Sequence, residues 1–153
     1  MKYINGLIDG KWIVDFDWIK SSLSRELWLA EHSFEVAGDE KCHLQIPKKF
    51  RTQEELLFQG YFLFFYGEFH SPSMDELSEI VEKCGATILK TLDELKEKIG
   101  KRKVHVICDA SIQNSFETGA SILKKFKPIL STDWILDSIS WRSVQDVKYY
   151  IAL

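Results

Sequence analysis

Cysteine, histidine and carboxylate side chains are the groups in this chain that could bind a metal or catalyse a reaction. Cys42 and His43 are adjacent and both are ligand types, but no second pair follows at the spacing of a zinc site. His32, His70 and His105 are scattered, and they form no Ser/His/Asp or Cys/His arrangement that would activate a nucleophile. The sequence therefore predicts no metal site, no cofactor and no enzymatic activity.

Adjacent carboxylates, which could act as a general acid and base, occur at Glu54-Glu55 and Asp75-Glu76. Both pairs lie at predicted turns or helix starts, where negative side chains stabilise the first turn of a helix. We interpret them as structural. The glycines form no loop of the kind that holds a phosphate.

Lysine and arginine cluster in three places where they could contact nucleic acid. The formal net charge of -3 argues against a dominant non-specific nucleic-acid surface. The cluster of Lys48, Lys49 and Arg51 follows Pro47, and we interpret this segment as a solvated linker. The clusters are Lys48, Lys49 and Arg51; Lys101, Arg102 and Lys103; and Lys124, Lys125 and Lys127.

One helical signature occurs twice, and it organises the chain. Residues 17–24 read DWIKSSLS and residues 133–140 read DWILDSIS, each after a short run typical of a β-strand, at 11–14 and 128–130. Two copies indicate two copies of one domain. Since only sixteen residues precede the first copy, we expect either an incomplete first domain or an appendage on one complete domain. Trp18 and Trp134 are predicted core residues.

The remaining elements are read from apolar periodicity and caps. Residues 1–8 predict a short amphipathic helix, and residues 25–56 predict a polar linker with little structure of its own. The run 58–66 predicts a central strand of a parallel sheet, because it is apolar on both faces. Ser73 and Glu76 form a capping box that begins a helix ending near Cys84. The further predicted elements are strands at 87–89, 104–108 and 129–130, a weak helix at 92–99 and a helix at 115–126.

Composition agrees with a packed α/β domain. The chain has 153 residues, 45% of them hydrophobic and 13% aromatic, which is ample for a core. No apolar run reaches the length that spans a membrane. The chain has three cysteines, an odd number whose spacing does not suggest disulfide pairs: Cys42, Cys84 and Cys108. This favours a reducing compartment, the cytoplasm or the nucleus.

Four short motifs in order resemble tandem BRCT repeats. They are Glu31-His32-Ser33-Phe34-Glu35-Val36, Tyr66-Gly67-Glu68-Phe69, Cys84-Gly85-Ala86 and Trp134-Ile135-Leu136-Asp137-Ser138. The resemblance implies an α/β, BRCT-like fold with a four-stranded parallel sheet flanked by helices. It divides the chain into the C-terminal part of a first repeat at 1–24, an inter-repeat linker at 25–56 and a complete second repeat at 57–153.

The resemblance also implies a function, because tandem BRCT repeats bind a phosphoserine-x-x-Phe peptide in the cleft between them. Lys2 matches the phosphate-binding Lys of the family, and a Lys at a helix start adds to the positive end of the helix. An exposed first-turn charge is an equally weighted alternative for Lys2. The resemblance assigns Ile4, Pro72 and Leu136 to the pocket for the peptide Phe, and Ser71 and Thr132 to the peptide rim. The implied partners are phosphoserine-containing repair and checkpoint proteins in the nucleus. DNA is implied only as a secondary partner, and no membrane partner is implied.

Departures from the family pattern predict that this function is impaired. The family's phosphate-binding Ser and an Arg that fixes the peptide backbone would precede Met1, and Pro72 and Thr132 replace the family's Met and Arg. Two alternatives remain open. One is a scaffold that binds an unmodified protein or a DNA end through the second or third basic cluster. The other is a structural fragment whose exposed sheet edge would make it associate.

Overall fold

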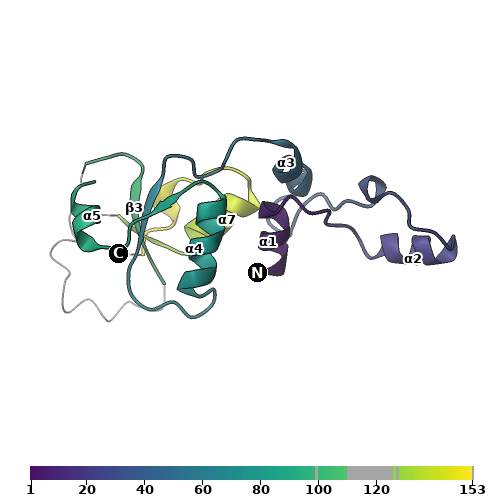
Figure 1. The fold of residues 1–153 in the computed structure, drawn as a ribbon, viewed down its shortest axis with the longest axis horizontal. Coiled ribbons are helices and arrows are strands. Elements are labelled where there is room, and N and C mark those ends of the chain that lie inside the picture. The colour runs from purple at the N-terminus through teal and green to yellow at the C-terminus, as the bar shows by residue number, and fades with distance from the viewer. Residues whose placement is uncertain (99, 110–125, 127, 153) are drawn as a thin grey trace. The chain divides into compact units, whose positions relative to one another are not determined.

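A computed structural model describes residues 1–98, 100–109, 126 and 128–152 (Figure 1). The chain divides into two compact units. The first comprises Met1–Glu54 with Ile139–Ser143, and the second comprises Glu55–Ser138 with Val144–Leu153. Each unit is described by itself.

The second unit is built on a four-stranded sheet in which every strand pair is parallel. The strand order is β2-β1-β3-β4, so β1 lies inside the sheet, as its apolar sequence predicts. The predicted four-stranded parallel sheet is therefore confirmed. The strands are β1 (Phe62–Phe65), β2 (Thr87–Ile88), β3 (Val104–Cys108) and β4 (Ile129–Ser131).

Helices α4 (Met74–Lys83), α5 (Leu92–Lys96) and α7 (Asp133–Ser140) accompany the sheet, with a 3-10 turn at Val147–Tyr149. The capping box is confirmed, because the Ser73 hydroxyl accepts the Glu76 N–H and the Glu76 carboxylate accepts the Ser73 N–H. The helix predicted at 115–126 lies, but for its last residue, outside the described residues.

Trp134 is at the centre of an aromatic cluster in this unit. Its side chain is fully buried, and its ring centroid lies 5.4 Å from that of Phe58 and 5.1 Å from that of His105. Its indole N–H donates to the Gln145 carbonyl at 2.9 Å. The predicted core role of Trp134 is confirmed.

The first unit contains α1 (Lys2–Ile8), α2 (Asp17–Ser24), a 3-10 turn at Glu31–Ser33 and α3 (Ile46–Thr52). Two predictions are wrong here. The strand expected at 11–14 is only an isolated antiparallel bridge between Val14 and Glu35. The segment at 25–56, expected to have little structure of its own, contains the seven-residue helix α3, in which Pro47 presets the first turn and Ile46 and Pro47 are both buried.

Trp18 is half-buried, so the prediction that it is a core residue is not confirmed. It stacks on Trp28 at 5.1 Å and donates its indole N–H to the Leu29 carbonyl at 2.8 Å. Trp28 itself is 74% exposed. Throughout the described ranges, no helix is both long and apolar enough to cross a membrane.

Candidate functional site

Lys2 is the predicted phosphate ligand, and it occupies the first position of α1. Its side chain is exposed, and none of the described residues pairs with its ammonium. Met1, the residue before α1, provides no side-chain cap for the first N–H groups of the helix. Ile4, the predicted pocket residue, is buried on the same helix together with Leu7.

Tyr3 lies between Lys2 and Ile4 in α1, and the sequence did not mark it as a site residue. Burial, with Asp39 and Cys42 nearby, raises the pKa of its hydroxyl to about 12. The oxygen is buried and meets no hydrogen-bond partner within the described part of the chain. The hydroxyl is therefore neutral at physiological pH.

The other four predicted site residues belong to the second unit. Ser71 is exposed and Pro72 is buried, and both directly precede the cap of α4. Thr132 and Leu136 are half-buried at the start of α7, where the Leu136 N–H donates to the Thr132 carbonyl at 3.3 Å. The structure thus brings Thr132 and Leu136 together within one helical turn. Lys2 and Ile4 belong to the first unit, so the six residues form two groups, each held by its own unit.

Arg51, from the first basic cluster, is engaged within the first unit. Its guanidinium donates to both carboxylate oxygens of Glu35 and lies 3.4 Å from the centroid of the Trp12 ring. The hydrogen bond to Glu35 raises the pKa of Arg51. Because Glu35 and Arg51 are sixteen positions apart in the sequence, no local pattern reveals the pair. The solvated-linker interpretation is therefore wrong for Arg51.

The second basic cluster is partly engaged as well. The Lys103 ammonium lies 3.2 Å from the Gln59 carbonyl and 4.9 Å from the centroid of the Tyr61 ring. Lys101 and Arg102 are exposed. The third cluster, at Lys124, Lys125 and Lys127, lies outside the described residues.

No group of three His, Cys, Asp or Glu side chains that could hold a metal ion occurs in the ranges that the structure describes. The three cysteines are buried and unpaired with one another. Burial raises the pKa of the Cys108 thiol, and Asp109 adds to the effect, so this thiol is a poor nucleophile at neutral pH.

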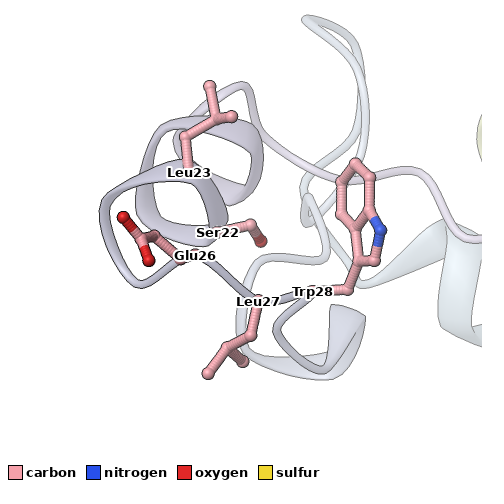
Figure 2. A pocket seen from close by; sticks show the side chains of 5 residues that line it. All are labelled: Ser22, Leu23, Glu26, Leu27 and Trp28. Carbon is pink, nitrogen blue, oxygen red and sulfur yellow. The ribbon is translucent and has the colours of Figure 1, made fainter.

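An apolar hollow of about 280 Å³ opens at the C-terminal end of α2 (Figure 2). Leu23 is 72% exposed at its edge, and Ser22 is buried beneath it. The sequence did not predict this hollow. Its lining residues are Ser22, Leu23, Glu26, Leu27 and Trp28.

Comparison with known proteins assigns the family. The model of the BRCT domain matches residues 56–151. The breast cancer type 1 susceptibility protein homolog of Mus musculus is 32% identical over 99% of this chain and 8% of its own length. Microcephalin of Colobus guereza is 25% identical over 95% of this chain and 16% of its own length.

Among solved structures, the BRCT5-BRCT6 domains of S. pombe Brc1 are similar in fold, with a TM-score of 0.67 over 94% of this chain and 74% of that one, at 18% identity. The chain spans less than a fifth of the length of the two sequence relatives. The family match agrees with the parallel sheet, the capped α4 and the buried Trp134, and the resemblance read from the sequence is confirmed. This chain belongs to the BRCT domain family.

Proposed function

We propose that this chain is a protein-interaction module of the nuclear DNA-damage response that binds phosphoserine-x-x-Phe peptides, with Lys2 as the phosphate ligand. Family membership and the similarity to the breast cancer type 1 susceptibility protein homologs support the proposal, since BRCT domains generally mediate protein contacts without catalysis. The partners would be phosphoserine-containing repair and checkpoint proteins.

The observation that carries the proposal is the state of Lys2. It is an exposed cation at the first residue of α1, and none of the described residues neutralises it. A phosphate there would gain a charge-assisted hydrogen bond from the ammonium. In this proposal Ile4, Pro72 and Leu136 line the pocket for the peptide Phe, and Ser71 and Thr132 form its rim.

We expect the affinity to be weak. One ammonium supplies only part of the charge-assisted bonding that a phosphate monoester accepts, and the proposal places no second cation beside it. A dissociation constant of about 1 mM corresponds to roughly 4 kcal/mol of binding free energy, which suits one such contact and one apolar pocket.

The test is a fluorescence titration of the chain with a labelled phosphoserine-x-x-Phe peptide and with its unphosphorylated twin. Lys2→Met removes the cation, and Lys11→Met is a matched control because Lys11 is exposed beyond the other end of α1. We expect phosphate-dependent binding that Lys2→Met abolishes and Lys11→Met preserves. Equal binding of both peptides would refute phosphate recognition, and tight binding unaffected by Lys2→Met would refute the role of Lys2.

A parallel titration with duplex DNA at two salt concentrations separates the scaffold alternative. Binding to DNA through Lys101 and Arg102 would weaken steeply as salt increases, because phosphate contacts release counterions. Phosphopeptide binding that needs one ammonium and an apolar pocket depends less steeply on salt.

A further inference from the structure

A polar pocket of about 270 Å³ lies within the first unit, apart from the hollow at α2. The residues that line it come from the segment 32–51, which contains part of the 3-10 turn, the loop after it and most of α3. None of the six residues proposed for phosphopeptide binding lines this pocket. Its polar lining residues are His32, Glu35, Gln45, Lys48 and Arg51.

Arg51 is held in one orientation at the wall of the pocket. The Glu35 carboxylate accepts one N–H from each terminal nitrogen of the guanidinium, and the Cζ atom of Arg51 lies over the Trp12 ring, 3.4 Å from its centroid. The side chains of Arg51 and Glu35 are only 21% and 9% exposed. A guanidinium fixed in this way loses little conformational entropy when it binds a further acceptor.

The pocket offers more hydrogen-bond donors than acceptors. A guanidinium has five N–H groups, so about three remain on Arg51 after the two bonds to Glu35. The side chains of His32, Gln45 and Lys48 are exposed, and none of them meets a partner in the part of the chain that the structure describes. Glu35 is the one carboxylate among the described lining residues, and both of its oxygens are already bonded to Arg51.

The charge of the lining is positive as well. With a neutral His32, the charges of Lys48, Arg51 and Glu35 leave one net positive charge around the pocket. A pocket with surplus cationic donors is complementary to an anion that carries several acceptor oxygens. The volume of about 270 Å³ is well above the roughly 30 Å³ that one water takes, so it can hold a polyatomic anion.

The number of donors favours a phosphate group over a carboxylate. One guanidinium edge satisfies both oxygens of a carboxylate, and here the Glu35 carboxylate already binds Arg51 in that manner. A phosphate group presents three acceptor oxygens and can therefore accept from a guanidinium, an ammonium and an amide at the same time.

We propose that this pocket is a phosphate-binding site in which Arg51, Lys48 and Gln45 donate to the phosphate oxygens. The free ion and the monoester of a phosphorylated side chain present the same oxygens, so both belong to the ligand class. The site is independent of the phosphate contact proposed for Lys2, which does not line the pocket.

Lys48 separates this proposal from a purely structural role of the Arg51–Glu35 pair. Its ammonium takes no part in the contacts that fix Arg51 on Trp12 and Glu35, and it is exposed. Lys48→Met therefore removes a phosphate donor and leaves the packing of Arg51 in place. Lys49→Met is the matched control, because Lys49 is the next residue of α3 and does not line the pocket.

The test is an NMR titration of the whole chain with inorganic phosphate, with phosphoserine amide and with acetate, at an ionic strength held constant with sodium chloride. The backbone amides of Ala37, Gln45 and Lys48 and the Nε–H signal of Arg51 report the pocket. The same titrations are made on Lys48→Met, Lys49→Met and Lys2→Met. Signals outside the pocket that keep their positions show that each variant is folded.

We expect saturable shifts of the pocket signals with inorganic phosphate, with a dissociation constant of roughly 10 mM or lower. Lys48→Met should weaken this binding at least about tenfold, the loss of one charge-assisted hydrogen bond, while Lys49→Met and Lys2→Met leave it unchanged. Saturation by phosphoserine amide as well would extend the ligand to a monoester, and saturation by inorganic phosphate alone would assign the free ion.

Shifts that grow linearly without saturation, an equal response to acetate, or binding that Lys48→Met leaves unchanged would overturn the inference. Loss of the pocket shifts in Lys2→Met would overturn it too, because the phosphate would then be bound at α1. A failure of the Lys2 proposal leaves this pocket unaffected, since the peptide titration reads Lys2 and these signals read Lys48.

Discussion

His105 shows how one half-buried ring links packing to pH. Its imidazole packs against the rings of Tyr61 and Trp134, with centroid distances of 5.9 Å and 5.1 Å. Burial lowers the pKa of His105 from its ordinary value of 6.5, because the protonated form loses hydration inside the cluster. The folded chain therefore holds His105 neutral where the unfolded chain would already bind a proton.

This difference predicts that the free energy of unfolding falls as pH decreases below about 6.5, and that His105→Phe removes this contribution. The sign follows from proton uptake. The unfolded state binds the proton first, so the contribution of His105 is complete above pH 6.5 and is lost as pH falls, with a slope of at most about 1.4 kcal/mol per pH unit.

Urea unfolding at a series of pH values between about 7.5 and 5 measures this slope. His43→Asn is the matched control, because it removes an exposed histidine of the first unit. A slope that persists in His105→Phe would place the linked proton on another group.

At the scale of elements, the end of α4 depends on a glycine for a steric reason. Gly85 follows the helix with a φ of +92°, and a Cβ added there would lie 2.8 Å from the Leu56 Cβ. Gly100 has a similar φ of +83°, but no described atom lies within 4 Å of its added Cβ. Comparing an alanine substitution at Gly100 with one at Gly85 therefore separates the cost of backbone strain from the cost of steric overlap.

We therefore predict that Gly100→Ala costs about 1 kcal/mol, the strain of a left-handed residue, and that Gly85→Ala costs at least about 1 kcal/mol more because Leu56 must move. Chemical denaturation of both variants measures the difference. Equal losses would mean that Leu56 adapts without cost.

At the scale of the whole molecule, one short antiparallel pairing occurs in both units, as Asp15 N–H to Phe34 C=O in the first and Ser131 N–H to Tyr150 C=O in the second. In the second unit β4 is anchored on β3, whereas the corresponding residues 13–15 pair on one side among the described residues. A backbone hydrogen bond in a supported sheet opens less often than the same bond at a free edge.

Hydrogen exchange of two equivalent amides tests this difference within one sample. The Asp15 N–H and the Ser131 N–H make matched bonds of 2.8 Å and 2.9 Å, so bond length alone predicts similar protection. We expect the Asp15 amide to exchange at least about tenfold faster after correction for intrinsic rates. Equal protection would mean that the first unit is as stable as the second.

The sequence by itself determined the elements whose causes are local. The apolar run before Tyr66 predicted β1, Ser73 and Glu76 predicted the start of α4, and the repeated Asp-Trp motif predicted both Trp helices. These predictions hold because periodicity and caps act over a few neighbouring residues. Family membership could also be read, since it depends on the order of such motifs.

Tertiary structure alone decided what depends on residues distant in the chain. The same Trp helix is buried at Trp134 and half-exposed at Trp18, because among the described residues only Trp134 has the rings of His105 and Phe58 against it. The Arg51–Glu35 pair on Trp12 and the hollow at α2 arise in the same way. Burial is a property of neighbours, and a sequence pattern does not say whether the neighbours are present.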